Sequence, residues 1–299
     1  MSWLAIIVLA YFIMAIISLF DRYFLVGPMA DPRIYTFNAG FLWMIFSLPL
    51  LFLGLHFPSL FFIALGLSAG FVRFFALFFL SSSISKTEIS RVVPIVGSLQ
   101  PIFSFLLFFP QSRSLALTQL LAFLLLVLGS ILISLKKSEK RSFNFENLKY
   151  PLIASLLYAC TFFLLKNAFL GIDFWSGVFL TLLGGGVASL LFLTVSGNRK
   201  AVFCQKRTGK TSGLFVFSQG LAGVAIFLQY YAVFLAKPGQ VPLINALEGT
   251  RYVFLFFLVL LVSRWKPSVL KEENSRETLI LKAAAIVIIC LGLALLNSK

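Results

Sequence analysis

Long apolar runs, separated by short polar segments, follow one another along the whole chain. Ten of these runs hold about 20 mostly apolar residues, the length that a helix needs to cross the hydrocarbon core of a bilayer. They are too long and too continuously apolar for barrel strands, which alternate over about ten residues. The pattern therefore predicts an all-α integral membrane protein with ten transmembrane helices. The runs cover Ser2–Phe20, Ile34–Leu53, Ser59–Leu80, Ser90–Phe109, Leu115–Leu135, Leu152–Leu170, Phe174–Val195, Ser212–Leu235, Val241–Val262 and Thr278–Leu296.

The composition agrees with this pattern and narrows the chemistry. Hydrophobic residues make up 60% of the 299 residues and charged residues 12%, against about 45–50% and about 25% in soluble chains. Cys160, Cys204 and Cys290 show no pairing or metal-binding spacing, and His56 is the single histidine. No Ser/His/Asp set or pair of carboxylates indicates an active site. We therefore expect no enzymatic activity, no catalytic residues, no metal and no cofactor.

The basic residues are concentrated in alternate loops. Of the 25 Lys and Arg, 19 lie in or beside the loops that follow predicted helices 1, 3, 5, 7 and 9. The positive-inside rule then puts these loops in the cytoplasm and both termini outside, in a multi-pass plasma or inner membrane. Such loops are suited to anionic lipids. Nucleic acid is not an expected partner, because the basic residues punctuate apolar runs instead of lining one polar domain.

Two segments near the middle of each half resemble each other. The sequence RVVPIVGSLQP aligns with GQVPLINALEG, 148 residues later, which pairs Pro94 with Pro242 and Gln100 with Glu248. Both prolines fall inside predicted helices, where proline frees a backbone carbonyl. We expect them to break the helices or to act in gating, as paired interruptions do in transporters. A packing kink without a ligand is the alternative.

These matches predict two repeats of five helices each. The first repeat would span residues 1–137 and the second residues 150–299, with a basic linker loop at 138–149. Because five is odd, the second copy must be inverted relative to the first. Inverted repeats are typical of secondary transporters, whose binding site lies near the membrane midplane.

The chain resembles the EamA family of the drug/metabolite transporter superfamily. The resemblance rests on Thr87–Phe103, with its serine, proline and L-x-P-x-F features, on its counterpart Val241–Phe254, and on the late glycines Gly129 and Gly292. It implies ten helices in two five-helix repeats. Members of that family usually have both termini in the cytoplasm, opposite to the orientation predicted from the basic residues.

Polar residues within the ninth run form the strongest candidate site. A charge in the hydrocarbon core costs about 2.5–3.5 kcal/mol, so it normally faces a cavity or a partner. On one continuous helix, Asn245, Glu248, Arg251 and Tyr252 would fall within an arc of about 120°. We expect these four residues to bind the substrate. The alternative is that Glu248 and Arg251 only pair with each other and hold the bundle together.

Other polar residues would complete the substrate site. Gln100 is the repeat counterpart of Glu248, and Gln229 lies in the eighth run beside Tyr230. For the tyrosine, an interfacial aromatic belt is the alternative. Arg73 lies well inside the third run, where it would face the cavity or extend its side chain to a lipid headgroup.

Two roles are considered for the remaining charged residues, a position at the membrane interface and the binding of a coupled ion. Glu88 and Arg91 lie near the start of the fourth run, as an interfacial pair or with Glu88 as an ion-coupling residue. Glu248 is the second candidate for ion coupling, since a membrane carboxyl group can carry a proton, although Arg251 would oppose this. Asp21, at the end of the first run, is expected to mark the interface.

The predicted function is secondary transport by alternating access. No ATP-binding motif is present in the sequence, so a gradient would drive it. Because Arg73, Arg91 and Arg251 outnumber Glu88 and Glu248, the expected substrate is a small anionic or zwitterionic, amino-acid-like metabolite. The protein would act as a monomer or homodimer. The alternative is a lipid-binding or flippase-like scaffold that transports no solute.

Overall fold

Helices account for nearly all of the structure. The computed structural model describes residues 2–57, 59–86, 89–112, 115–134, 145–204, 209–265 and 276–297, and these ranges contain no β-strand. The longer helices are α1 (Ser2–Val26), α2 (Pro32–Ser47), α3 (Leu60–Lys86), α4 (Ile89–Leu107), α6 (Leu117–Ser134), α7 (Phe145–Ala168), α8 (Phe174–Phe192), α10 (Gly209–Leu235), α12 (Gly249–Trp265) and α13 (Arg276–Asn297). The short ones are η1 (Leu48–Leu53), α5 (Phe109–Ser112), α9 (Ser196–Cys204), η2 (Pro238–Gln240) and α11 (Val241–Ala246).

Each of the ten predicted apolar runs contains a helix. Within the described ranges, seven helical segments are long and apolar enough to cross a membrane. The fourth, fifth and tenth runs hold the shorter apolar stretches Ile95–Leu107, Leu117–Leu132 and Ala283–Leu296. The fold class is therefore all-α, with several apolar helices that are consistent with a multi-pass membrane protein.

Three boundaries differ from the sequence prediction. The predicted linker 138–149 is helical at its end, because α7 begins at Phe145. The basic loop after α8 contains the short helix α9. The single helix predicted over Val241–Val262 is wrong, since the chain forms α11 and α12 with a turn at Leu247 and Glu248.

Local sequence signals explain where several helices begin. At the start of α2, Asp31 accepts a hydrogen bond from the Arg33 backbone N–H, 2.9 Å away, and Pro32 occupies the first helical position. The hydrogen bond from the Arg33 side chain holds the pKa of the Asp31 carboxyl below its usual value. Asp173 caps α8 in the same way, through the Ser176 backbone N–H.

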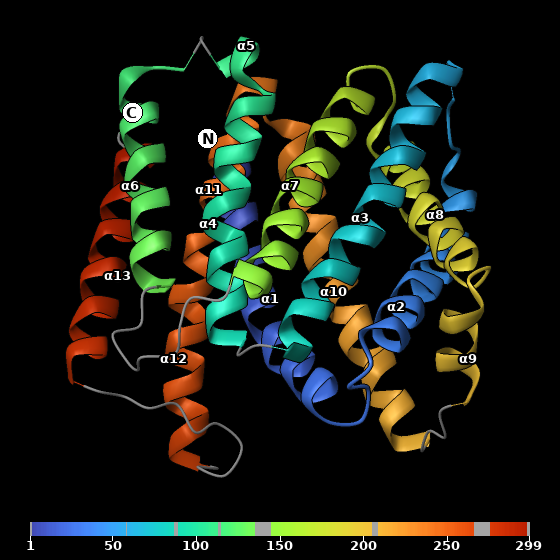
Figure 1. Ribbon diagram of the computed structural model, residues 1–299. Helices are drawn as coiled ribbons and strands as arrows, with labels where there is room; N and C mark the ends of the chain where they lie inside the picture. Colours follow the sequence, from blue (N-terminus) through green and yellow to red (C-terminus); the bar gives the residue numbers. More distant parts are fainter. Residues whose placement is uncertain are drawn as a thin grey trace.

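The helices pack into a bundle whose centre is formed by elements from both halves of the chain. Helix α3 packs against α7 and α8, α1 against α10 and α12, and α4 against α7 and α11. Helices α2 and α8 pack together on one side, and α6 and α13 form a pair at the other (Figure 1). This arrangement brings α1, α3, α4, α7, α10 and the α11–α12 turn around one central region.

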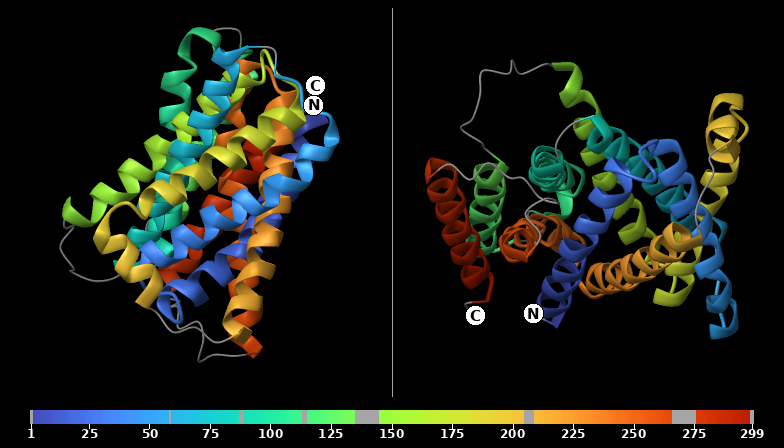
Figure 2. Two further views of the ribbon diagram at one scale, coloured as in Figure 1. Left: turned by 90° about the vertical axis from the view of Figure 1, so that its right-hand side faces the viewer. Right: turned by 90° about the horizontal axis from the view of Figure 1, so that it is seen from below.

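The two ends of the bundle differ in charge. Helices α1, α3, α6 and α12 end, and α2, α4, α7 and α13 begin, at the lower end in Figure 1. We call this the basic end, because it includes Arg22, Arg33, Lys86 and Lys149. Both chain termini lie toward the opposite end (Figure 2). The alternation of basic and non-basic loops in the sequence thus becomes an asymmetry between two ends of one molecule.

Candidate functional site

The centre of the bundle holds an interrupted helix. Pro242 lies in the first turn of α11, a position that accommodates proline, so the predicted break at Pro242 is wrong in its position. The interruption comes later, where the Glu248 N–H donates to Asn245 O (3.1 Å) and the Thr250 N–H to Leu247 O (2.9 Å). These tighter bonds replace the α-helical pattern and leave Glu248 in the turn between two helices.

A tyrosine from α1 stabilises this interruption. In a continuous α-helix the Ile244 carbonyl would accept a bond from the Glu248 N–H. Here it accepts instead from the Tyr11 hydroxyl at 2.9 Å. The Gln229 side-chain amide of α10 donates in turn to the Tyr11 hydroxyl at 3.4 Å. Tyr11 is fully buried, so this contact satisfies a carbonyl that water does not reach.

Glu248 and Arg251 form an ion pair at the same place. Arg251 Nη1 lies 3.1 Å from Glu248 Oε1, and Arg251 Nε and Nη2 donate to Ser18 Oγ at 3.1 and 2.8 Å. The two residues therefore pair, as the alternative interpretation supposed. The pairing does not exclude them from a site, because both side chains also line a cavity.

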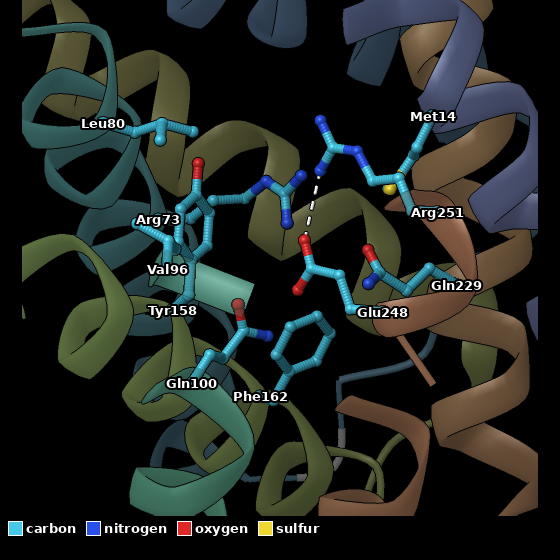
Figure 3. A pocket seen from close by; sticks show the side chains of 10 residues that line it. All are labelled: Met14, Arg73, Leu80, Val96, Gln100, Tyr158, Phe162, Gln229, Glu248 and Arg251. Atoms are coloured by element: carbon cyan, nitrogen blue, oxygen red, sulfur yellow. Dashed lines mark hydrogen bonds and ion pairs between the residues drawn. The ribbon is translucent and has the colours of Figure 1, made fainter. Parts of the chain in front are cut away.

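This central cavity has a volume of about 70 Å³. Figure 3 shows its lining side chains, which come from α1, α3, α4, α7, α10 and α12 and from the turn before α12. Five of the eight residues predicted to bind substrate line it: Arg73, Gln100, Gln229, Glu248 and Arg251. Its other lining residues were not among those predicted to bind substrate: Met14, Leu80, Val96, Tyr158 and Phe162.

Two pairs of residues that correspond to each other in the predicted repeats lie around the centre of the bundle. Gln100 and its predicted counterpart Glu248 both line the cavity, from α4 and from the α11–α12 turn. Tyr158 follows Tyr11 by 147 residues, close to the offset of the other matches. That spacing is the signal by which the sequence could have identified Tyr158 as a site residue.

Arg73 is the one cavity arginine that forms no ion pair within 4.0 Å among the described residues. Its guanidinium carbon lies 5.4 Å from the ring centres of both Trp43 and Tyr230, so two aromatic faces hold the charge. Only 8% of the residue is exposed, which rules out the extended, headgroup-reaching alternative. In Figure 3 its guanidinium points into the space toward the Glu248 carboxylate.

Three predicted binding residues support the cavity without lining it. Tyr230 packs its ring on Arg73. The Asn245 side-chain amide donates to Ser104 Oγ of α4 at 2.9 Å. The Tyr252 hydroxyl lies against the backbone of Gly97, where even a Cβ atom would collide with it. Asn245 and Tyr252 therefore join α11 and α12 to α4.

Some predicted residues lie outside what the structure describes. Glu88, a candidate for ion coupling, is among them, and so are the side chains of Arg91 and Pro94. The backbone at Pro94 is helical, within an α4 that runs unbroken over Ile89–Leu107. Within the described ranges, no group of three His, Cys, Asp or Glu residues could hold a metal ion.

A second, apolar groove of about 410 Å³ lies between α2, α8 and α10. Trp43 and Phe46 of α2, Leu182 of α8, and Gly223 and Phe227 of α10 are among its lining residues. Trp43 lines this groove, and its ring faces Arg73, which lines the central cavity. The groove and the central cavity are therefore separated by a few side chains.

Comparison with known proteins identifies a shared fold and no family. No protein-family model and no curated protein matches the chain. A solved structure described as "Crystal structure of protein" is similar over 99% of this chain and 98% of its own, with 13% sequence identity and a TM-score of 0.72. At this identity the likeness concerns the fold alone, which the two chains share over their full lengths.

Proposed function

We propose that the chain is a ten-helix transporter of the drug/metabolite type, built from two inverted five-helix repeats. The helix packing supports this. In an inverted repeat, each helix of the first half has a counterpart in the second: α1 and α7, α2 and α8, α3 and α10, α4 and α11 with α12, and α6 and α13. If each helix is replaced by its counterpart, the α3–α7 contact becomes α10–α1, and the α4–α7 contact becomes α12–α1. The α2–α8, α6–α13 and α4–α11 contacts convert into themselves. All of these pairs pack against each other.

We infer that the substrate is a small anionic or zwitterionic metabolite. The observation that carries this inference is Arg73, a buried guanidinium without an ion pair among the described residues, facing the central cavity. With Arg251 paired to Glu248, the cavity keeps one positive charge to be neutralised. A substrate carboxylate bound to Arg73 would supply the missing charge through a planar, two-bond contact.

The neighbouring groups suit an amino-acid-like molecule. Gln100, Gln229 and Tyr158 offer donors and acceptors around Arg73, and the Glu248 carboxylate could accept from a substrate ammonium group. By volume, the cavity has room for about five water-sized groups. A molecule the size of glycine or acetate would fit the closed cavity, whereas a larger one would require the helices to separate.

Transport would proceed by alternating access around this site. The α11–α12 turn interrupts a helix beside the substrate position, a feature that transporters use for binding and for movement. The two halves would rock about the cavity, opening first to one end of the bundle and then to the other. The basic end would face the cytoplasm, where anionic lipids would contact it.

A thermal-shift screen of the purified protein tests this proposal. The probes are acetate, lactate, glycine, alanine and glutamate, with choline as the cationic comparison. We expect at least one carboxylate to raise the melting temperature of the native protein and of Arg199→Ala, an exposed control at the basic end. Arg73→Ala should lose that shift. A shift with choline alone, or an unchanged shift in Arg73→Ala, contradicts the proposal.

The apolar groove favours a second candidate function. Its lining is suited to an acyl chain, and Trp43 connects it to the charged cavity. A lipid-binding or flippase-like protein would use the groove for a tail and the cavity for a headgroup. Fluorescent phospholipid movement in proteoliposomes separates the two. Lipid movement without uptake of a cavity-binding carboxylate would favour this second function.

A further inference from the structure

Asp21 belongs to a polar cluster between α1, α2 and α10 that the sequence did not predict. The Tyr35 hydroxyl donates to Asp21 Oδ1 at 2.5 Å, and the Gln219 side-chain amide donates to the Tyr35 hydroxyl at 3.3 Å. Tyr35 is 3% exposed and Gln219 5% exposed. Asp21 was expected to mark the interface; in addition, its carboxyl group accepts a hydrogen bond from the buried Tyr35 of α2, which Gln219 of α10 supports in turn.

This carboxyl group has no ion pair among the described residues. Its hydrogen-bond partner is a neutral hydroxyl, and no Lys or Arg nitrogen lies within 4.0 Å. Asp21 is half-buried, and a carboxylate that is partly removed from water is costly without a partner, so the group is protonated or finds a cation. A tyrosine hydroxyl serves both states, because it donates to a carboxylate and accepts from a carboxylic acid.

Arg251 is the cation within reach. It is bound to Ser18, which lies three residues before Asp21 on α1 and therefore one turn away on the same face. Asp21 and Arg251 form no ion pair within 4.0 Å in the described part of the chain. Arg251 is thus paired with Glu248 and bound to Ser18, a residue one helical turn from Asp21 on α1.

The other titratable groups around Asp21 do not compete for this role. Tyr35 of α2 is its hydrogen-bond donor, and Gln219 of α10 is neutral. Tyr158 of α7 interacts with both Asp21 and Arg251 but carries no positive charge. Arg251 is therefore the cation that couples the Asp21 cluster to the central cavity.

We propose that Asp21 is a second proton-binding carboxyl group of the transport site, which exchanges Arg251 with Glu248. While Arg251 pairs with Glu248, Asp21 holds a proton. When Arg251 moves to Asp21, that proton passes to water at the basic end, and Glu248 takes up a proton from water in the cavity. In the return step the cavity faces the basic end, Glu248 releases its proton there, Arg251 pairs with Glu248 again, and Asp21 takes up a proton from the same side. A full cycle of the two steps thus carries one proton across the site. This inference rests on the proposed transport function, for which it supplies the coupling ion.

The physical reason for the exchange is that one guanidinium can neutralise only one of two carboxylates, the buried Glu248 or the half-buried Asp21. Leaving the other charged and unpaired would be strongly unfavourable in this setting. Its protonation state must therefore change when the arginine moves. A substrate carboxylate that attracts Arg251 away from Glu248 would trigger the step, so substrate and proton movements would be linked.

Dicyclohexylcarbodiimide, an apolar reagent that modifies buried protonated carboxyl groups, tests this directly on the full chain in detergent. Mass spectrometry of peptides locates the modification. We expect Asp21 to be labelled in the native protein. In Glu248→Gln, Arg251 has Asp21 as its remaining partner, so the labelling of Asp21 should be lost. In Arg251→Gln, both Asp21 and Glu248 should be labelled.

Lys166→Gln is the matched control, because it removes a buried charge that lies on another helix and binds Val233 O and Phe234 O. It should leave the labelling of Asp21 unchanged. An unlabelled Asp21 in the native protein, or equal labelling in Glu248→Gln and the native protein, would overturn the proposal. The assay uses no substrate, so its outcome is independent of the thermal-shift test. If Glu248→Gln does not fold, Glu248→Ala is the second variant, and it should lose the labelling of Asp21 for the same reason.

Discussion

Glu248 and Arg251 form a 3.1 Å ion pair at the point where α11 gives way to α12. Glu248 lies just before the first residue of α12, where the helix dipole favours a negative charge. Arg251 lies in the first turn of α12 and holds Ser18 of α1, 233 residues earlier in the chain. One pair therefore joins the helix interruption, the central cavity and the first helix.

We expect this pair to show strong coupling in a double-mutant cycle. Removing one partner forces the other to lose its charge or to find a new partner, and breaking a buried pair in this way costs about 3–5 kcal/mol. Glu248→Gln and Arg251→Gln should each lower the melting temperature in detergent more than the double substitution does. Additive effects would mean that the pair is exposed to water and contributes little.

We expect both the positive charge of Arg73 and the planar shape of its guanidinium group to contribute to carboxylate binding. Arg73→Ala should weaken binding of a carboxylate probe by about 10- to 100-fold, since hydrogen bonds to charged groups contribute about 1.5–3 kcal/mol. Arg73→Lys should bind with intermediate affinity, because lysine keeps the charge and loses the flat stacking on Trp43 and Tyr230. Calorimetric titration measures both. Equal affinities in the native protein and Arg73→Lys would show that the stacking has no role.

The Tyr11 hydroxyl should stabilise the interrupted helix. Tyr11→Phe leaves the Ile244 carbonyl without its bond, which costs about 1–3 kcal/mol for a buried acceptor. Its melting temperature should fall by several degrees. Tyr23→Phe removes the same atom from a residue that is 51% exposed and should have no effect. Equal melting temperatures for the two variants would contradict this role of Tyr11.

Close contact between α3 and α8 should make Gly70 intolerant of substitution. A Cβ atom at Gly70 would collide with the Thr181 carbonyl oxygen, and backbone atoms cannot turn aside as a flexible side chain can. Gly70→Ala should therefore cost about 1–3 kcal/mol through overpacking. At Gly220, also within a helix, a Cβ meets open space, so Gly220→Ala should gain up to about 1 kcal/mol in helix propensity. Thermal unfolding of the two purified variants compares these effects, and equal destabilisation would contradict the packing argument.

The orientation can be tested with one cysteine at each end of the bundle. In a background with Cys160, Cys204 and Cys290 replaced by serine, Lys237→Cys should react in intact cells with a membrane-impermeant maleimide. Lys149→Cys, exposed at the basic end, should react only after the membrane is permeabilised. The reverse pattern would place the basic end outside and would restore the orientation usual for EamA proteins.

The sequence was most informative about properties that depend on each residue and its near neighbours along the chain. Run length and hydropathy located a helix in every predicted span, and Arg73, Gln100, Gln229, Glu248 and Arg251 were chosen because polar groups are costly in hydrocarbon. It was least informative about the helix break, which Pro242 suggested and which lies at Leu247 and Glu248 instead. A proline in the first turn of a helix and one in its middle look alike until the start of the helix is known.

By itself, the sequence determined that the chain is helical and apolar, that its basic residues alternate between loops, and which few polar groups needed an explanation. These properties depend on each residue and its near neighbours along the chain. Only the tertiary structure decided that Tyr11 bonds to Ile244, that Arg251 reaches Ser18, and that Tyr35 joins Asp21 to Gln219. Such contacts join residues on different helices, and in all but one case more than 150 positions apart. They depend on how whole helices pack, which no local pattern of apolar and polar positions encodes.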